Sequence, residues 1–320
     1  MGRLNVSGLA ILLVVNGAGA ARAGPGIDQF EMKDLDSAPG DMQFQSQNAI
    51  ATGQPRRHVI ETSPGQFAFD DNTVARERYA LEMQMGITTW FRTRLGVEFE
   101  KERLDDPGAV SRANAYDDLH LTSAALESVL VFVPVKKEGI GLGLLTEFDD
   151  SLRAGGKQLY IGPIIQAVSG PWTGIANLLL VQHFGSPDRF HLLPADRSVD
   201  FAYALELQYE FSPTWALALE AYGTFDRVSP AGSQRENLAL FGRFDQHRTG
   251  PVVYYRFDPN PAASPNAKPG GLKALAKDDA DTAEGGKDKE TSVSIGVGML
   301  FGLNANTPDE TLKLSLEYNF

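Results

Sequence analysis

Histidines and glycine-rich motifs are the first residues in which to look for chemistry. The five histidines show no HxxxH-like ligand spacing (His58, His120, His183, His191 and His247). Cysteine is absent, which excludes a thiolate metal site and a disulfide framework. Gly139 to Gly143 (GIGLG) superficially resembles a phosphate loop but lacks the strand-to-helix context, so we interpret its glycines as positions on a crowded inner wall. No nucleophile can be paired with a base. We therefore predict no enzyme activity, no cofactor and no metal site.

Charged residues at every second position carry more information. In Val199 to Phe211, apolar and aromatic side chains alternate with Asp200, Glu206 and Glu210, which is the periodicity of a β-strand. If the apolar face meets lipid, the charged face must point inward, because a charge facing lipid near mid-bilayer costs ~2–4 kcal/mol. The candidate lumen-lining set is Arg78, Glu82, Arg92, Arg94, Glu98, Glu100, Glu147, Asp149, Asp200, Glu206, Glu210, Glu220, Asp226, Arg248, Arg256, Lys313 and Glu317.

Two interpretations of this charged set stay open. The charges could pair across a narrow lumen and fill it, as in small barrels. Alternatively, some of them could line a water-filled pore and filter solutes by charge. Acids outnumber bases in the set, which favours cations or neutral solutes over anions.

The end of the chain indicates the environment of these strands. Thr311 to Phe320 alternates over ten residues and stops on an aromatic residue. An ordinary amphipathic strand of a soluble sheet could alternate in the same way. The terminal pattern resembles the C-terminal signal of bacterial outer-membrane barrels, and this resemblance implies that the barrel assembly machinery reads it by strand addition. The predicted assembly signal consists of Leu314, Leu316, Tyr318 and Phe320.

Twelve segments of this kind follow one another along the chain. They are 42–50, 78–87, 91–101, 119–135, 140–149, 158–168, 172–184, 199–211, 215–226, 246–257, 292–301 and 311–320. Short connections alternate with longer ones, as expected for an even-stranded barrel whose two ends lie on the periplasmic side. The fold class predicted is therefore all-β, a closed antiparallel transmembrane β-barrel of about twelve strands.

Some segments fit this pattern less simply. The register of 119–135, which contains Glu127, is ambiguous and predicts a bulge. Residues 51–74 are interpreted as a loop. Residues 258–290 stand where a short turn is expected, but they carry four prolines and many charges, so we predict a disordered periplasmic insertion. An error of one in the strand count is the alternative.

The other end of the chain predicts export. Arg3, the apolar run Leu9 to Val15 and the small-x-small site at Ala21 to Ala23 form a signal peptide over 1–23. The apolar run is too short to span a bilayer as a helix. We expect cleavage, passage through the inner membrane, a periplasmic lead-in over 24–41 and a barrel over 42–320 in the outer membrane. The net charge of −12 argues against nucleic acid as a partner.

Four patches suggest a family. They are Tyr160 to Pro163 (YIGP), Leu217 to Gly223 (LALEAYG), His247 to Tyr255 (HRTGPVVYY) and Val297 to Phe320. Together they resemble proteobacterial outer-membrane β-barrels of the phenol meta-pathway or general outer-membrane transport type. The resemblance implies architecture more than activity, because its motifs are structural. Twelve strands around a charged lumen favour a porin-like passive channel or uptake protein for small solutes, with outer-membrane lipid and the barrel assembly machinery as expected partners. A non-conducting interaction barrel that acts through its loops or its insertion is the alternative.

Overall fold

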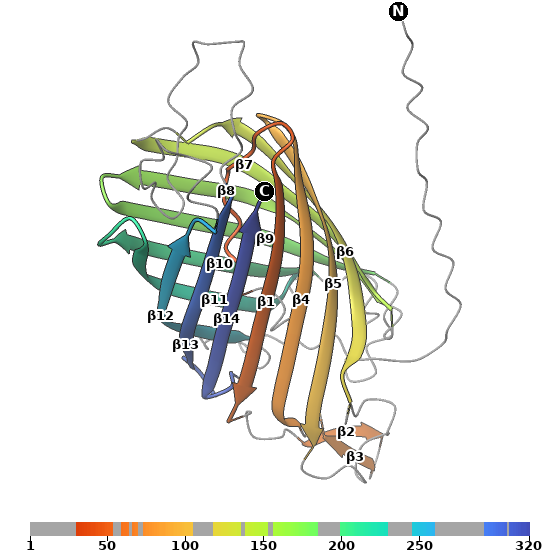
Figure 1. The fold of residues 1–320 in the computed structure, drawn as a ribbon. Coiled ribbons are helices and arrows are strands. Elements are labelled where there is room, and N and C mark those ends of the chain that lie inside the picture. Colours follow the sequence, from red (N-terminus) through yellow and green to blue (C-terminus); the bar gives the residue numbers. More distant parts are fainter. Residues whose placement is uncertain are drawn as a thin grey trace, which may run out of the picture.

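The computed structural model describes residues 30–53, 59–63, 66–69, 73–104, 118–135, 138–152, 156–184, 199–229, 245–259, 291–305 and 307–320. The predicted signal peptide, residues 24–29 of the lead-in and residues 260–290 of the predicted insertion lie outside these ranges. Within them the chain forms a closed antiparallel barrel of twelve strands (Figure 1). The fold class expected from the sequence is therefore confirmed.

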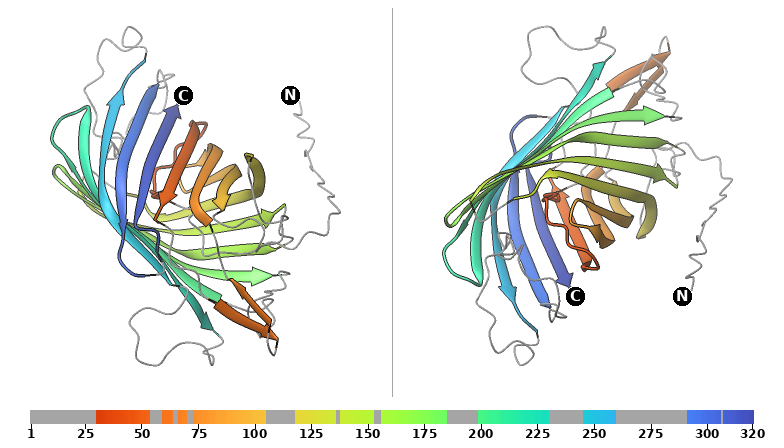
Figure 2. Two further views of the ribbon diagram at one scale, coloured as in Figure 1. Left: turned by 90° about the horizontal axis from the view of Figure 1, so that it is seen from below. Right: turned by 90° about the horizontal axis from the view of Figure 1, so that it is seen from above.

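The barrel follows the order of the chain. Its strands are β1 (Met42–Thr52), β4 (Thr73–Thr88), β5 (Phe91–Leu104), β6 (His120–Val133), β7 (Gly139–Ser151), β8 (Lys157–Ser169), β9 (Trp172–Phe184), β10 (Val199–Glu210), β11 (Trp215–Ser229), β12 (Gln246–Phe257), β13 (Ser292–Gly302) and β14 (Glu310–Asn319). Each strand pairs with its neighbour in sequence, and β1 pairs with β14 to close the ring (Figure 2). Closure gives the backbone N–H and C=O groups of β1 and β14 hydrogen-bond partners, which lipid cannot supply.

One additional element corrects the interpretation of residues 51–74 as a loop. Strands β2 (Val59–Ser63) and β3 (Gln66–Phe69) form a separate two-stranded sheet beyond one end of the barrel (Figure 1). Both runs are rich in β-branched or aromatic residues, and they face each other across a very short connection.

The predicted irregularity in 119–135 takes the form of two register shifts. The β5–β6 pairing shifts between Glu98 and Phe99, and the β6–β7 pairing shifts between Val131 and Val133. Between the two shifts, Glu127 lies opposite Arg94 on β5 and opposite Glu147 on β7. The side chain of Glu127 is buried inside the barrel, with 3% of its surface exposed.

The two faces of the wall differ in chemistry. Large apolar side chains such as Leu95, Leu126 and Leu205 are exposed on the outer face, while the buried inner positions carry many polar and charged residues. Aromatic pairs gather on the outside at the end where the chain terminates, including Trp172 with Tyr209 (ring centroids 4.7 Å apart). Apolar outer bands flanked by aromatic girdles are typical of barrels embedded in a membrane. Within the described ranges, no helix has the length and apolar character to cross a bilayer.

Candidate functional site inside the barrel

An extended stretch of chain that precedes β1 lies inside the barrel. We call residues 30–38 the lumen segment. Phe30, Glu31, Met32, Lys33 and Leu35 are each 3–6% exposed, although no secondary-structure element contains them. The sequence interpretation placed 24–41 outside the barrel as a periplasmic lead-in, and for residues 30–38 this is wrong. The segment offers charges and backbone groups that the inner wall binds.

The lumen segment enters at the end of the barrel where β1 begins. Gly40, with φ of 78°, forms the turn into β1, and its amide donates to the carbonyl oxygen of Gly86 at 2.8 Å. The Ser37 hydroxyl donates to the carbonyl oxygen of Thr88 at 2.6 Å. A Cβ atom at Gly86 would lie only 2.0 Å from the carbonyl oxygen of Ala38. Glycine at this position therefore lets the segment pass close against β4.

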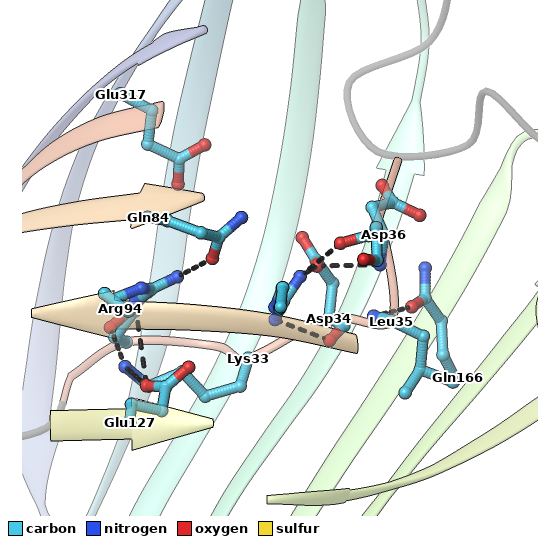
Figure 3. Close-up of polar contacts among 12 residues, drawn as sticks. Lys33, Asp34, Leu35, Asp36, Gln84, Arg94, Glu127, Gln166 and Glu317 are labelled. Atoms are coloured by element: carbon cyan, nitrogen blue, oxygen red, sulfur yellow. Dashed lines mark hydrogen bonds and ion pairs between the residues drawn. The ribbon is translucent and has the colours of Figure 1, made fainter. Parts of the chain in front are cut away.

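Two wall amides hold one edge of the segment backbone. The Lys33 amide donates to Asn177 Oδ1 at 2.9 Å, and Asn177 Nδ2 donates back to the Lys33 carbonyl at 2.8 Å. The Leu35 amide donates to Gln166 Oε1 at 2.8 Å (Figure 3). Asn177 and Gln166 are 1% and 0% exposed. Side chains of β9 and β8 thus make the contacts that a neighbouring strand would make.

Arg92 of β5 holds the opposite edge. Its guanidinium donates to the carbonyl oxygens of Asp34 at 2.8 Å and Asp36 at 2.6 Å. It also pairs with the Asp34 carboxylate at 2.5 Å. A planar guanidinium can donate several bonds at once in a fixed geometry, which suits this triple contact. Arg92 is itself 1% exposed, so the three acceptors compensate the loss of its hydration.

A compact ionic network surrounds Lys33. Its ammonium group lies 2.5 Å from Glu127 and 3.8 Å from Glu82, and it also pairs with Glu31 (Figure 3). Arg94 joins the same group by pairing with Glu31 and with Glu82 at 2.9 Å. Buried charges must be paired to offset their desolvation, and here the pairing requires the segment.

Apolar contacts anchor the segment at Leu35 and at Phe30. The Leu35 side chain packs against Gly141 and Gly143. A Cβ atom at Gly143 would lie 2.5 Å from Leu35 Cδ2, and a Cβ atom at Gly141 would lie 2.8 Å from Leu35 Cδ1. Gly141 and Gly143 belong to the GIGLG run. Its glycines therefore form a depression for Leu35, in keeping with a crowded inner wall. At the other end, the Phe30 ring packs edge-on against Tyr222, with centroids 5.3 Å apart.

A second buried network lies beside Phe30. Lys313 of β14 pairs with Glu220 of β11 at 2.5 Å and donates to the Tyr222 hydroxyl at 2.9 Å. The hydroxyls of Tyr222 and Tyr254 both donate to Glu220. Lys313 and Glu220 are 2% and 0% exposed. This network joins β11, β12 and β14 across the inner wall.

Other polar contacts lie along the inner face of the barrel. Arg76 and Arg78 pair with Glu100 at 2.9 and 3.0 Å. His183 lies 2.8 Å from Asp200. Within the described part of the chain, no three His, Asp or Glu side chains are grouped so that they could hold a metal ion.

The predicted lumen-lining residues whose side chains the structure describes fall into two classes of burial. Buried members are Arg92, Arg94, Glu100, Glu147, Asp200, Glu206, Glu220, Arg248 and Lys313. Half-buried members are Arg78, Glu82, Glu98, Asp149, Glu210, Arg256 and Glu317, whereas the side chain of Asp226 lies outside the described set. The fold joins Glu82 with Arg94, Arg78 with Glu100, and Glu220 with Lys313.

Sequence reasoning did not select several residues that matter most here. Lys33 and Glu31 were assigned to the lead-in, Glu127 was hidden by its ambiguous register, and the uncharged Gln166 and Asn177 lay outside a search for charge. One signal was available. Phe30 and Met32 alternate with Glu31 and Lys33, and this period of two is typical of an extended segment with two distinct faces.

Comparison with solved structures supports the architecture. The chain is similar to an outer membrane channel from Pseudomonas putida F1, with a TM-score of 0.52 and 12% sequence identity over 91% of this chain and 99% of that chain. It also matches KdgM porin (TM-score 0.38, 8% identity, 88% and 99% coverage) and a Pseudomonas aeruginosa FadL homologue (0.36, 8%, 88% and 90%). No protein-family model and no curated protein sequence matches the chain. The first likeness shows the fold of an outer-membrane β-barrel, and the phenol meta-pathway type stays a prediction.

Proposed function

We propose that this protein is an outer-membrane channel or uptake barrel for small solutes, with the lumen segment as its internal plug. The observation that carries this proposal is the chemistry of the segment's contacts. Beside the apolar contacts of Phe30, Met32 and Leu35, they include ion pairs and hydrogen bonds to side chains, such as Asn177 to Lys33 and Arg92 to Asp34. Water can replace such contacts, whereas a purely structural core would be expected to bury mostly apolar surface.

The backbone hydrogen bonds of the barrel wall do not depend on the segment. Every barrel strand is paired on both sides with another barrel strand. Removing a stretch of chain from the interior would therefore leave the ladders intact and expose a charged passage. The acids that outnumber bases among the inner residues favour cationic or neutral solutes.

Location and biogenesis belong to the same proposal. An apolar outer face with an aromatic girdle supports insertion in the outer membrane. We infer that residues 1–23 direct export and are then cleaved. We infer further that the barrel assembly machinery reads the last strand through Leu314, Leu316, Tyr318 and Phe320.

The test is a comparison of two purified proteins in planar bilayers. One is the full mature chain, and the other has residues 30–37 replaced by a Gly-Ser spacer of equal length. The spacer variant is expected to conduct more and to let larger sugars enter liposomes. A potassium chloride gradient should give a reversal potential of the sign expected for cation preference. Shifted mobility of the unheated protein on gels confirms that each barrel is folded.

One alternative is supported by a specific observation. The networks around Lys33 and Lys313 are buried and well paired, as they would be in a permanently filled, structural barrel. In that case both folded proteins would remain silent in bilayers and would leave liposomes sealed. This result would reject the channel in favour of a non-conducting interaction barrel.

A further inference from the structure

The lumen segment is bound in the manner of a peptide ligand. Residues 33 and 35 present their backbone to Asn177 and Gln166, whereas the carbonyl oxygens of residues 34 and 36 face Arg92 on the other edge. In a β-strand, the backbone N–H and C=O groups of successive residues point to opposite edges of the strand. The wall therefore recognises an extended main chain from both sides.

The spacing of the two wall amides matches this conformation. Asn177 pairs with Ile164 in the β8–β9 ladder, so Asn177 and Gln166 are diagonal neighbours on the inner face. Diagonal neighbours lie about 7–8 Å apart. Alternate residues of an extended chain repeat every ~6.6–6.8 Å. A peptide can thus meet both amides without bending.

One donor of this site has no acceptor among the residues that the structure describes. Gln166 is fully buried, and among the described residues its Nε2 atom has no hydrogen-bond partner, although its Oε1 atom accepts from Leu35. Asn177 makes both bonds of an amide pair, while Gln166 makes one of two. A buried donor without an acceptor is costly. Among the described residues, the segment thus leaves one buried donor of the site unpaired.

Three neighbouring subsites add side-chain preference. Glu127 and Glu82 receive the ammonium group of Lys33. Arg92 receives the carboxylate of Asp34. The glycines at 141 and 143 leave room for the branched side chain of Leu35. Main-chain bonds combined with side-chain pockets are the general mode by which proteins bind extended peptides.

We propose that the inner wall of β4–β9 is a binding site for extended peptides with a cationic, an acidic and a branched apolar residue in succession. The lumen segment occupies this site in cis. Peptides of this class would compete with the segment for the site and then pass through the barrel. Their passage rests on the proposed channel function. A tethered competitor has an effective concentration in the millimolar range, so peptides displace it only when they are abundant or bind more tightly.

Binding is tested on the full chain in detergent, independently of conduction. A triple variant, Lys33→Gly, Asp34→Gly and Leu35→Gly, empties the three subsites while keeping the length of the chain. The probe is a fluorescein-labelled peptide of sequence Glu-Met-Lys-Asp-Leu-Asp, followed by fluorescence anisotropy. We expect saturable binding to the triple variant and at least tenfold weaker binding to the unaltered protein.

Altered peptides and a wall variant test whether the site recognises the peptide main chain and the lysine side chain as proposed. Methylation of the leucine amide removes the donor to Gln166 and should weaken binding about tenfold. The Glu127→Gln change should weaken binding of the lysine peptide but not of a peptide with norleucine in its place. Equal binding of the methylated and unmethylated peptides, or no saturable binding at millimolar concentration, would overturn the proposal.

A second measurement covers the case in which the triple variant does not fold. The chain contains no cysteine, so Met32→Cys introduces a single thiol at a position that is 6% exposed. Millimolar peptide should accelerate labelling of this thiol, whereas a peptide of scrambled order should not. Unchanged labelling would count against the peptide site. Bilayer conductance separately decides the channel function, so the two ideas can fail independently.

Discussion

Replacing Lys33 by alanine should loosen the lumen segment without disturbing the barrel. The substitution removes the ion pair with Glu127 at 2.5 Å, the weaker one with Glu82 at 3.8 Å and the pair with Glu31 within the segment. Breaking a buried pair costs about 3–5 kcal/mol when the remaining charge has no other partner. Glu127 retains Arg94 at 3.9 Å, and it regains water once the segment leaves, so the smaller value of about 2–3 kcal/mol is appropriate.

This free energy corresponds to a measurable change in the docking equilibrium. Each 1.4 kcal/mol is a factor of about ten, so the undocked fraction should increase by about 30- to 150-fold. In a Met32→Cys background, the rate of thiol labelling reports that fraction directly. The same change should increase the open probability in planar bilayers by a comparable factor, up to saturation.

The protein offers a matched control for this experiment. Lys157 pairs with Asp150 at 3.1 Å, but both side chains are largely exposed, at 49% and 40%. Surface pairs contribute at most about 1 kcal/mol, and Lys157→Ala removes the same charge. It should leave labelling and conductance unchanged. If Lys33→Ala behaves like Lys157→Ala, the ionic network does not hold the segment and the reasoning is refuted.

Three further predictions concern the entry of the segment, the second network and the last residue. Gly86→Ala would bring a Cβ to 2.0 Å from a segment carbonyl and should increase Met32→Cys labelling, whereas Gly174→Ala, with its nearest atom 3.9 Å away, should not. Lys313→Met should destabilise the barrel by about 3–5 kcal/mol in denaturant unfolding, and adding Glu220→Gln should restore most of that loss. Phe320→Ala keeps the two backbone hydrogen bonds between residue 320 and Met42 but should lower the yield of assembled barrel in cells. An unchanged yield would argue against an aromatic signal.

The outer face of the barrel could be read from the sequence with few errors. Leu205 and Leu217 alternate with Glu206 and Ala218, and the structure exposes the first pair and buries the second. This prediction succeeded because a strand places successive side chains on opposite faces, whatever the surroundings of each face. The β2–β3 sheet was missed because two short strands give too few residues for periodicity to stand out.

The interior was predicted only in part. Alternation selected Arg92, Arg94 and Glu147 as inward-facing, but it contained no information about which charges meet. The pairing of Lys33 with Glu127 joins residues far apart in the sequence, and it exists only because β4 to β9 are rolled around the segment. Uncharged residues such as Asn177 become important there through the backbone that they bind, which a search for charge does not detect.

By itself the sequence determined the strand periodicity, the number of barrel strands, the apolar outer face and the excess of acids within. These properties depend on neighbours along the chain and on the cost of charge in lipid. Only the tertiary structure decided that residues 30–38 lie in the lumen and that Glu127, Arg92 and Asn177 hold them. Those contacts require barrel closure, which brings side chains from separate strands around one axis and leaves buried polar groups that must find partners.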